Sequence, residues 1–366
     1  MKRAAALFLI LSVLSGPALG AGPSVSARGA VLMDGDSGRV LWSQNGEEAL
    51  PIASTTKLMT ALVAYEYDPT LQSVVEIDPA WTGIEGSSLY LRAGEKLTLE
   101  ELLYGVLLVS GNDAAEAVAG SCGGDRSDFI KRMNETAAEL GMTQSHFSTP
   151  SGLEDEGNYA SATDLARLAR AFLAVEPLAK IAATPVTTIG MRTLLNHNKL
   201  LWRYEGCIGL KTGYTQKAGR TLVSAAEREG QILIAVTLND RDDWADHAEL
   251  LDYGFSTFPR AELVAGGTEI ATLPVTGAVP GLVSVAAGES VYCALESGET
   301  VEQTVELPAA LEAPLEAGQT VGQMVFTLDG ETVGETPLVV TQSVSDLRAG
   351  ERSLLDWLRL LWLGSD

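Results

Sequence analysis

Cysteine and histidine are scarce in this sequence. The 366 residues contain three cysteines, Cys122, Cys207 and Cys293, and three histidines. An odd number of widely spaced cysteines makes no disulfide framework, so these side chains are predicted to be small, partly buried and apolar. The histidines share no ligand spacing with one another or with the cysteines. We therefore expect no metal site and no cofactor.

Positive charge is also in deficit. The chain has 25 Lys and Arg against 48 Asp and Glu, which gives a formal net charge of −23. Nucleic-acid binding needs clustered basic side chains that neutralise phosphates, so nucleic acid is excluded as an expected partner. The hydrophobic content of 46% and the length allow two or three folded units.

Apolar runs are short. The stretch 4–14 follows a short basic segment, Met1-Lys2-Arg3, and is too short to span a bilayer comfortably. The segment Pro17-Ala18-Leu19-Gly20 before Ala21 fits a small-x-small cleavage site, so residues 1–20 are predicted to be a signal peptide and the mature chain to be exported. An uncleaved N-terminal anchor is the alternative.

Strand patterns stand at both ends of a helical middle. A β-hairpin is predicted at 30–43, helices dominate 47–175, and further strands are predicted at 186–189, 208–214, 220–226 and 231–237, before a helix at 244–253. Helix N-caps are predicted at Thr98 (in a capping box with Glu101), Ser127 and Ser161. This order predicts an α+β domain over residues 21–257, with an antiparallel sheet built from both halves and a helical insertion.

The C-terminal third has two different patterns. Residues 258–341 show short apolar alternations and Gly-rich turns, which predict a small all-β domain. In residues 342–366, the apolar Leu354, Leu358 and Trp362 share one helical face and charged residues share the other. This pattern predicts an amphipathic helix lying in a membrane surface. A helix packed on the β-domain is the alternative.

Three short polar motifs carry the chemistry. Ser54 and Lys57 stand three apart at the start of a helical pattern, so a buried lysine with a lowered pKa can take the proton of the serine hydroxyl. Alone, this pair also fits a serine N-cap beside a solvated lysine. Ser110-Gly111-Asn112 interrupts two helical patterns, and Lys211-Thr212-Gly213 lies on a predicted strand.

In order and context, these motifs resemble those of the penicillin-recognising serine acyltransferases. The whole layout is similar to the D-alanyl-D-alanine carboxypeptidases, the low-molecular-mass penicillin-binding proteins of the S11 peptidase family. The similarity is carried by residues 53–60, 109–115, 161–166, 196–201, 209–219 and 250–255. It implies a β-lactamase/transpeptidase-like catalytic domain that acts on peptidoglycan stem peptides, is inhibited by β-lactams and lies on the outer face of the cytoplasmic membrane.

The resemblance also implies catalytic roles. Ser54 would be the acylated nucleophile that attacks the carbonyl between two terminal D-alanines. Lys57 would be the general base for acylation, and Ser110 would relay a proton to the leaving amine. Water would then release the acyl-enzyme.

The binding roles implied by the resemblance lie on two further motifs. Asn112 would bind the substrate amide. Lys211 and Thr212 would meet the substrate carboxylate, and Gly213 would let the substrate backbone lie along the strand. The backbone N–H groups of Tyr214 and the nucleophile would form the oxyanion hole.

One departure from the resemblance concerns an arginine that many family members place shortly before the Gly-Phe that ends the last catalytic-domain helix, where it helps bind the terminal carboxylate of the substrate. Asp243 and Trp244 occupy that neighbourhood here, and Arg241 is the nearest arginine. We expect His247 to be a helix-surface residue. A β-lactamase is the nearest rival function, although residues 154–158 lack the Glu-x-x-Leu-Asn loop of class A enzymes. A non-catalytic cell-wall-binding scaffold is the other alternative.

Overall fold

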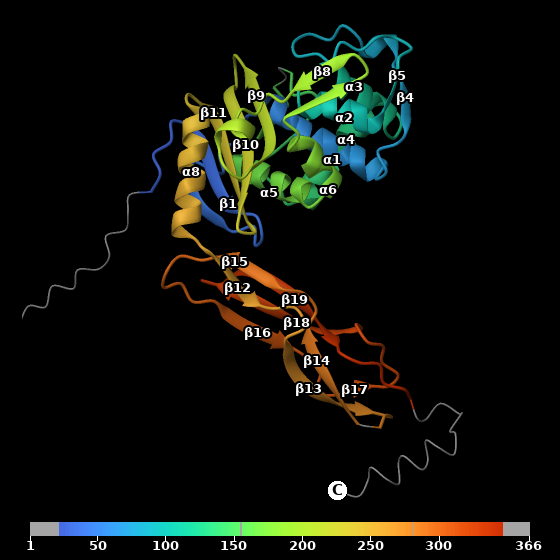
Figure 1. The fold of residues 1–366 in the computed structure, drawn as a ribbon, viewed down its shortest axis with the longest axis vertical. Coiled ribbons are helices and arrows are strands. Elements are labelled where there is room, and N and C mark those ends of the chain that lie inside the picture. Colours follow the sequence, from blue (N-terminus) through green and yellow to red (C-terminus); the bar gives the residue numbers. More distant parts are fainter. Residues whose placement is uncertain (1–21, 154–155, 280, 347–366) are drawn as a thin grey trace, which may run out of the picture.

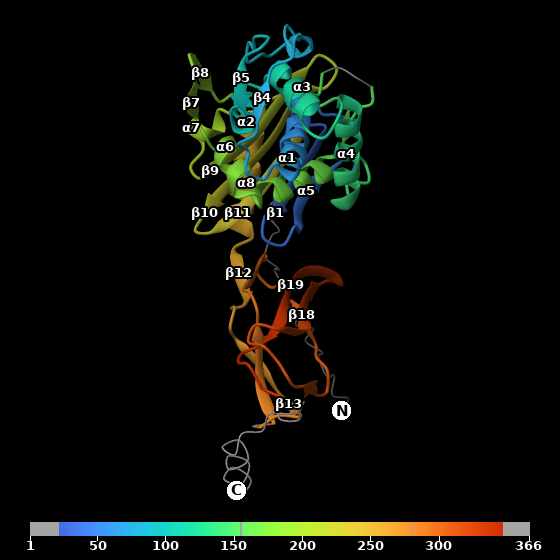
Figure 2. The ribbon, with the colours of Figure 1, turned by 90° about the vertical axis from the view of Figure 1, so that its right-hand side faces the viewer.

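The computed structural model describes residues 22–153, 156–279 and 281–346. The predicted signal peptide and residues 347–366 of the predicted terminal helix lie outside these ranges. The described chain forms two parts along one long axis, a mixed helix-and-strand part and a part made of strands alone (Figures 1 and 2).

A five-stranded antiparallel sheet forms the centre of the first part, in the order β2-β1-β11-β10-β9. Its strands are β1 (Gly29–Asp34), β2 (Val40–Gln44), β9 (Cys207–Thr215), β10 (Gly219–Arg228) and β11 (Gln231–Asp240). The N-terminal strand β1 pairs with β11, with Val31 opposite Val236. The predicted sheet from both halves of the chain is therefore confirmed.

Helices cover both faces of this sheet. On one face lies α8 (Asp243–Thr257), and on the other α5 (Ala162–Leu173) packs against β1 and β11 (Figure 1). Because both faces are covered, every residue of β1 is buried. The remaining helices are α1 (Lys57–Tyr67), α2 (Leu99–Leu107), α3 (Asn112–Ser121), α4 (Arg126–Glu139), α6 (Glu176–Ala182) and α7 (Leu200–Arg203). Short strands accompany them: β3 (Leu50–Pro51), β4 (Val74–Glu76), β5 (Lys96–Thr98), β6 (Tyr159–Ala160), β7 (Val186–Ile189) and β8 (Arg192–Leu195).

Two predicted helix caps are confirmed and one is wrong. Thr98 forms the full capping box with Glu101, and Ser161 accepts the N–H of Asp164. At α4, however, the cap is Asp125, whose carboxylate accepts the backbone N–H of Ser127. A carboxylate two residues earlier accepts hydrogen bonds from the free N–H groups at the start of the helix, where the serine was predicted to be the cap.

Two helix ends also differ from prediction. The helical pattern predicted through residue 175 breaks at Leu173, where α5 ends, and the separate helix α6 follows it. Helix α8 continues past Gly254 to Thr257. A Cβ at Gly254 would come within 2.5 Å of Leu233 Cδ1. This glycine therefore allows close packing on the sheet and does not end the helix.

The second part is all-β, as predicted, and has its own apolar core. Its strands are β12 (Arg260–Val264), β13 (Glu269–Thr276), β14 (Leu282–Ala287), β15 (Val291–Ala294), β16 (Glu302–Glu306), β17 (Leu311–Glu312), β18 (Thr320–Leu328) and β19 (Glu331–Val340). Ion pairs join it to the β1–β2 turn, where Arg39 meets Glu299 and Arg260 meets Asp36 at 2.7 Å.

The described residues include no helix long and apolar enough to cross a membrane. Within the same residues, no group of three or more His, Cys, Asp or Glu side chains is arranged to bind a metal ion. All three cysteines are free, and Cys122 and Cys293 are buried, in line with their expected packing role.

Candidate active site

Ser54 lies in a tight turn directly before α1. The turn is a 3₁₀ helix, η1 (Ala53–Thr56), and Lys57 is the first residue of α1. Ala53 has a φ of +47°, a left-handed conformation that is uncommon for residues other than glycine. The carbonyl of Ile52 accepts hydrogen bonds from the hydroxyls of Thr55 and Thr221, at 2.6 and 3.1 Å. These contacts fix the strained turn that presents the Ser54 hydroxyl.

Lys57 is fully buried and points at Ser54. Its Nζ lies 3.0 Å from Ser54 Oγ, 2.8 Å from Asn112 Oδ1 and 2.6 Å from the Ser151 carbonyl oxygen. Burial, and secondarily the charge of Lys211, lower the pKa of Lys57 well below its usual value. The neutral amine of Lys57 has two N–H protons and one lone pair. It donates both N–H groups to Asn112 Oδ1 and Ser151 O, which can only accept hydrogen bonds. Its lone pair is then directed at the Ser54 hydroxyl.

The Ser110-Gly111-Asn112 motif joins α2 to α3. Ser110 has a left-handed backbone, with φ of +59°. The amide nitrogen Nδ2 of Asn112 donates to the Glu85 carbonyl at 2.6 Å, so Oδ1 faces Lys57. The sequence reasoning missed Asp113, whose buried carboxylate accepts the backbone N–H groups of Leu89 and Leu91 at 2.8 and 3.0 Å. Asp113 thereby fixes the loop that contains Leu89 and Leu91. The sequence signal that could have identified this role is an acidic residue directly after the Ser110-Gly111-Asn112 motif.

Strand β9 brings the third motif to Ser54. Lys211 is 1% exposed, and burial lowers its pKa to about 7. Its Nζ donates to the Thr212 carbonyl at 2.8 Å. A Cβ on Gly213 would lie 2.9 Å from Ser54 N and 2.4 Å from Thr221 Oγ1. A glycine is therefore needed here for the strand to approach the serine turn.

These motifs meet in one open cleft of about 570 Å³. Its lining residues are Ser54, Ser87, Ser110, His197, Lys199, Thr212, Gly213, Tyr214, Arg220, Asp243 and Trp244. Three separate chain segments thus contribute side chains to one site, while Lys57 and Lys211 lie buried beneath it. His197, Lys199 and Arg220 were not expected from the sequence.

Arg241 is not among the residues that line this cleft. Its side chain is exposed, and its backbone N–H donates to Ser26 Oγ at 3.3 Å. The expectation for His247 is wrong. His247 is fully buried between α8 and the sheet, where its ring contacts the hydroxyls of Ser224 and Thr237 at 2.6 and 3.0 Å. Burial lowers the pKa of His247 to about 3, which keeps it neutral.

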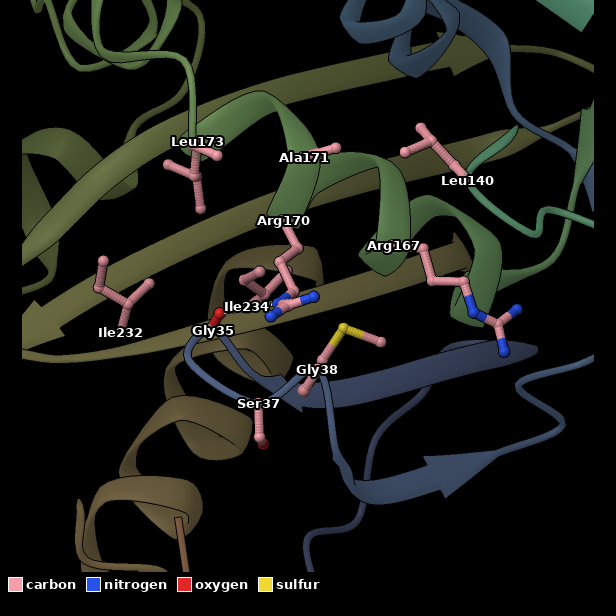
Figure 3. A pocket seen from close by; sticks show the side chains of 12 residues that line it. Gly35, Ser37, Gly38, Leu140, Arg167, Arg170, Ala171, Leu173, Ile232 and Ile234 are labelled. Carbon is pink, nitrogen blue, oxygen red and sulfur yellow. Dashed lines mark hydrogen bonds between the residues drawn. The ribbon is translucent and has the colours of Figure 1, made fainter. Parts of the chain in front are cut away.

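A second hollow, of about 590 Å³, lies between α5 and the β1–β2 turn (Figure 3). Arg170 donates there to the carbonyls of Gly35 and Asp36, and Arg167 pairs with Asp164 at 2.7 Å. None of the predicted site residues lines it. Its arginines have structural partners, so the smaller cleft is the candidate active site.

Comparison with known proteins agrees with this geometry. A family model described as D-alanyl-D-alanine carboxypeptidase matches residues 18–242, and one described as the C-terminal domain of penicillin-binding protein 5 matches residues 258–346. D-alanyl-D-alanine carboxypeptidase DacF of Bacillus subtilis is 31% identical, over 91% of this chain and 90% of its own length. DacA of Escherichia coli K12 is 33% identical, over 93% and 90%.

Solved structures agree as well. Penicillin-binding protein 5 of Haemophilus influenzae superposes with a TM-score of 0.73 at 29% identity, covering 88% of this chain and 98% of that one. A Streptococcus pneumoniae structure titled peptidoglycan synthesis regulatory factor (PBP3) gives a TM-score of 0.78 at 27% identity, covering 88% and 100%. The fold and the site therefore define a penicillin-binding protein of the β-lactamase/transpeptidase-like class. Within that class, the chain belongs to the D-alanyl-D-alanine carboxypeptidase family.

Proposed function

We propose that this chain is a serine-type D-alanyl-D-alanine carboxypeptidase. It removes the terminal D-alanine from peptidoglycan stem peptides through an acyl-enzyme on Ser54, and β-lactams inhibit it by acylating the same serine. The observation that carries the proposal is the environment of Lys57, whose Nζ has two pure acceptors and one hydroxyl within 3.0 Å. Family membership supports it and does not favour the lactamase or the scaffold.

Acylation begins when Ser54 Oγ attacks the peptide carbonyl. Lys57 Nζ takes the hydroxyl proton, since it lies 3.0 Å away and burial disfavours its charged form. The developing oxyanion is bound by the backbone N–H groups of Ser54 and Tyr214. The close approach of Gly213 to Ser54 N supports this pairing. Each such donor contributes about 3–4 kcal/mol in studied enzymes.

The leaving amine receives its proton through Ser110, which lines the same cleft. Asn112 contacts the substrate amide with the second proton of Nδ2, because the first is bonded to the Glu85 carbonyl. Thr212 and Lys211 meet the substrate carboxylate, whose charge favours the protonated form of Lys211. Water then hydrolyses the acyl-enzyme and regenerates Ser54.

The test is D-alanine release from a stem-pentapeptide mimic by the purified chain. Wild type should release one D-alanine, and Ser54→Ala should release none. Ser256→Ala, a change at an exposed hydroxyl on α8, is the matched control and should retain full activity. Rapid penicillin hydrolysis without D-alanine release would assign a lactamase. A folded wild type that neither releases D-alanine nor binds penicillin would assign a scaffold.

We further propose the division 1–20 signal peptide, 21–257 catalytic domain, a β-domain from residue 258 and a C-terminal membrane-surface helix, with the mature protein on the outer face of the cytoplasmic membrane. The predicted boundary between 341 and 342 lies too early, because Val344 pairs with Leu315 and is buried in the core of the β-domain. The separate cores of the two described parts and the family match that begins at residue 258 support the middle boundary. Removing residues 347–366, which keeps Val344 paired with Leu315 in the β-domain, should release the protein from the membrane fraction with activity on soluble peptide unchanged. A truncated protein that stays in the membrane fraction would contradict the anchor.

A further inference from the structure

The proposed reaction needs a cation beside the scissile bond. A carboxypeptidase cleaves the last peptide bond, so the residue it removes carries a free carboxylate. Moving that carboxylate from water into a cleft costs free energy unless charged or N–H donors replace the lost water. A guanidinium does this best, because it can donate two parallel hydrogen bonds to one carboxylate.

Lys211 alone meets this need poorly. It is 1% exposed, and burial lowers its pKa to about 7, so burial disfavours its charged form. Its Nζ also donates to the Thr212 carbonyl at 2.8 Å. A guanidinium stays charged throughout this pH range.

We infer that Arg220 binds the terminal carboxylate of the scissile peptide, and that Asp243 positions the Arg220 guanidinium for this contact. The inference rests on the proposed function and deepens it. It names a specificity-determining residue on β10, whereas the family resemblance left Arg241 as the nearest arginine for this role.

The pairing of β10 with β9 places Arg220 beside β9, the strand along which the substrate backbone is expected to lie. Arg220 is directly opposite Tyr214 in the β9–β10 pair, and Thr212 lies two residues along β9 from Tyr214. Side chains of directly paired residues, and of residues two apart, share one face of a sheet. Arg220 and Thr212 are therefore diagonal neighbours on the same face, within reach of a long side chain. Both line the cleft with Ser54.

Asp243 pairs with the Arg220 guanidinium through only one of its nitrogen atoms. Its Oδ1 accepts Arg220 Nη1 at 3.0 Å and the backbone N–H of Trp244 at 3.2 Å, and its side chain is only 6% exposed. The Arg220 side chain remains 51% exposed. A guanidinium has five N–H donors, so a pair through Nη1 leaves others for a ligand. The pair thus restrains the side chain at the cleft wall and lowers the ordering cost of carboxylate binding.

The test compares two peptide substrates that differ only at the C-terminus. One ends in D-alanyl-D-alanine with a free carboxylate, and the other has the same sequence with a C-terminal carboxamide. For Arg220→Gln, we expect kcat/KM on the acid to fall about 10- to 100-fold, mainly through KM, as expected for loss of a charge-assisted bond. The kcat/KM on the amide should change less than about threefold. The ratio of kcat/KM on the acid to kcat/KM on the amide should therefore fall sharply.

The amide also reports folding, because a misfolded variant would lose both substrates equally. Arg28→Gln, at a surface arginine paired with Glu48, is the matched control and should leave both values unchanged. Arg220→Lys should lie between wild type and Arg220→Gln.

Three results would overturn the inference. An equal fall of kcat/KM on both substrates in Arg220→Gln would mean that Arg220 has a structural role. An unchanged kcat/KM on the acid would mean that Arg220 does not contact the substrate. A collapse of the ratio in Lys199→Gln or Arg241→Gln, but not in Arg220→Gln, would move the carboxylate contact to that residue. Absence of D-alanine release by wild type would instead overturn the proposed function itself.

Discussion

Replacing Lys57 by methionine tests the assigned base most directly. The change keeps a long unbranched side chain but removes the nitrogen that lies 3.0 Å from Ser54 Oγ. A positioned general base contributes about 10²- to 10⁴-fold to a rate, which corresponds to about 3–5 kcal/mol of activation free energy. We expect acylation by a fluorescent penicillin to slow by that factor.

The same change affects stability, so the two effects must be separated. Methionine leaves Asn112 Oδ1 and the Ser151 carbonyl without the donor that Lys57 supplies, at about 1–3 kcal/mol for each unsatisfied group. It also removes the cost of burying an amine. Thermal melting should therefore accompany the kinetics, with acylation measured well below the midpoint of unfolding.

The assay is stopped-flow or gel-based labelling over a range of penicillin concentrations and pH. Lys131→Met, at a lysine whose side chain is 75% exposed on α4, is the matched control and should acylate at the wild-type rate. Wild-type acylation should fall as pH decreases through the lowered pKa of Lys57, because a protonated amine cannot accept the proton of Ser54. A folded Lys57→Met protein that acylates within threefold of wild type would show that Lys57 is not the general base.

Three further predictions follow from other contacts. Gly152→Ala should slow acylation and lower the melting temperature, because Gly152 has a φ of +74° and its added Cβ would lie 1.9 Å from the Ala53 carbonyl oxygen; wild-type values in both assays would contradict this. Thr98→Ala should lower the free energy of unfolding by about 1 kcal/mol in urea titrations, through loss of the capping box with Glu101, and a change below 0.3 kcal/mol (roughly the measurement limit) would contradict it. Between pH 7 and 9, Lys211 is protonated in the unfolded chain but largely neutral in the native chain, because burial lowers its pKa to about 7. The free energy of unfolding of wild type should therefore rise with pH by up to about 1.4 kcal/mol per pH unit more than that of Lys211→Met. Equal pH slopes of the free energy of unfolding in the two proteins would contradict the lowered pKa.

Local chemistry made part of the fold predictable. The capping box at Thr98 and the turn between β1 and β2 depend on residues near in sequence, so their patterns identified them. The cap of α4 failed because two side chains, Asp125 and Ser127, compete for the same N–H groups and a sequence pattern does not rank them. His247 failed because its burial depends on packing against distant strands.

The candidate site divides in the same way. Ser54 and Lys57 are three residues apart, so helical spacing predicted their contact, which the structure has at 3.0 Å. The carbonyl of Ser151 that accepts from Lys57 lies 94 residues away along the chain and belongs to a loop without a motif. The Arg220–Asp243 pair likewise depends on the register of β10 and the start of α8. Such partners become visible only when tertiary structure brings them together.

The intact mass of the protein after incubation with penicillin, followed by mapping of the modified peptide, tests the central assignment most directly. We expect one penicillin adduct per chain, located on Ser54 and absent from Ser54→Ala. An adduct on any other residue, or an unmodified wild-type protein that is folded, would contradict it.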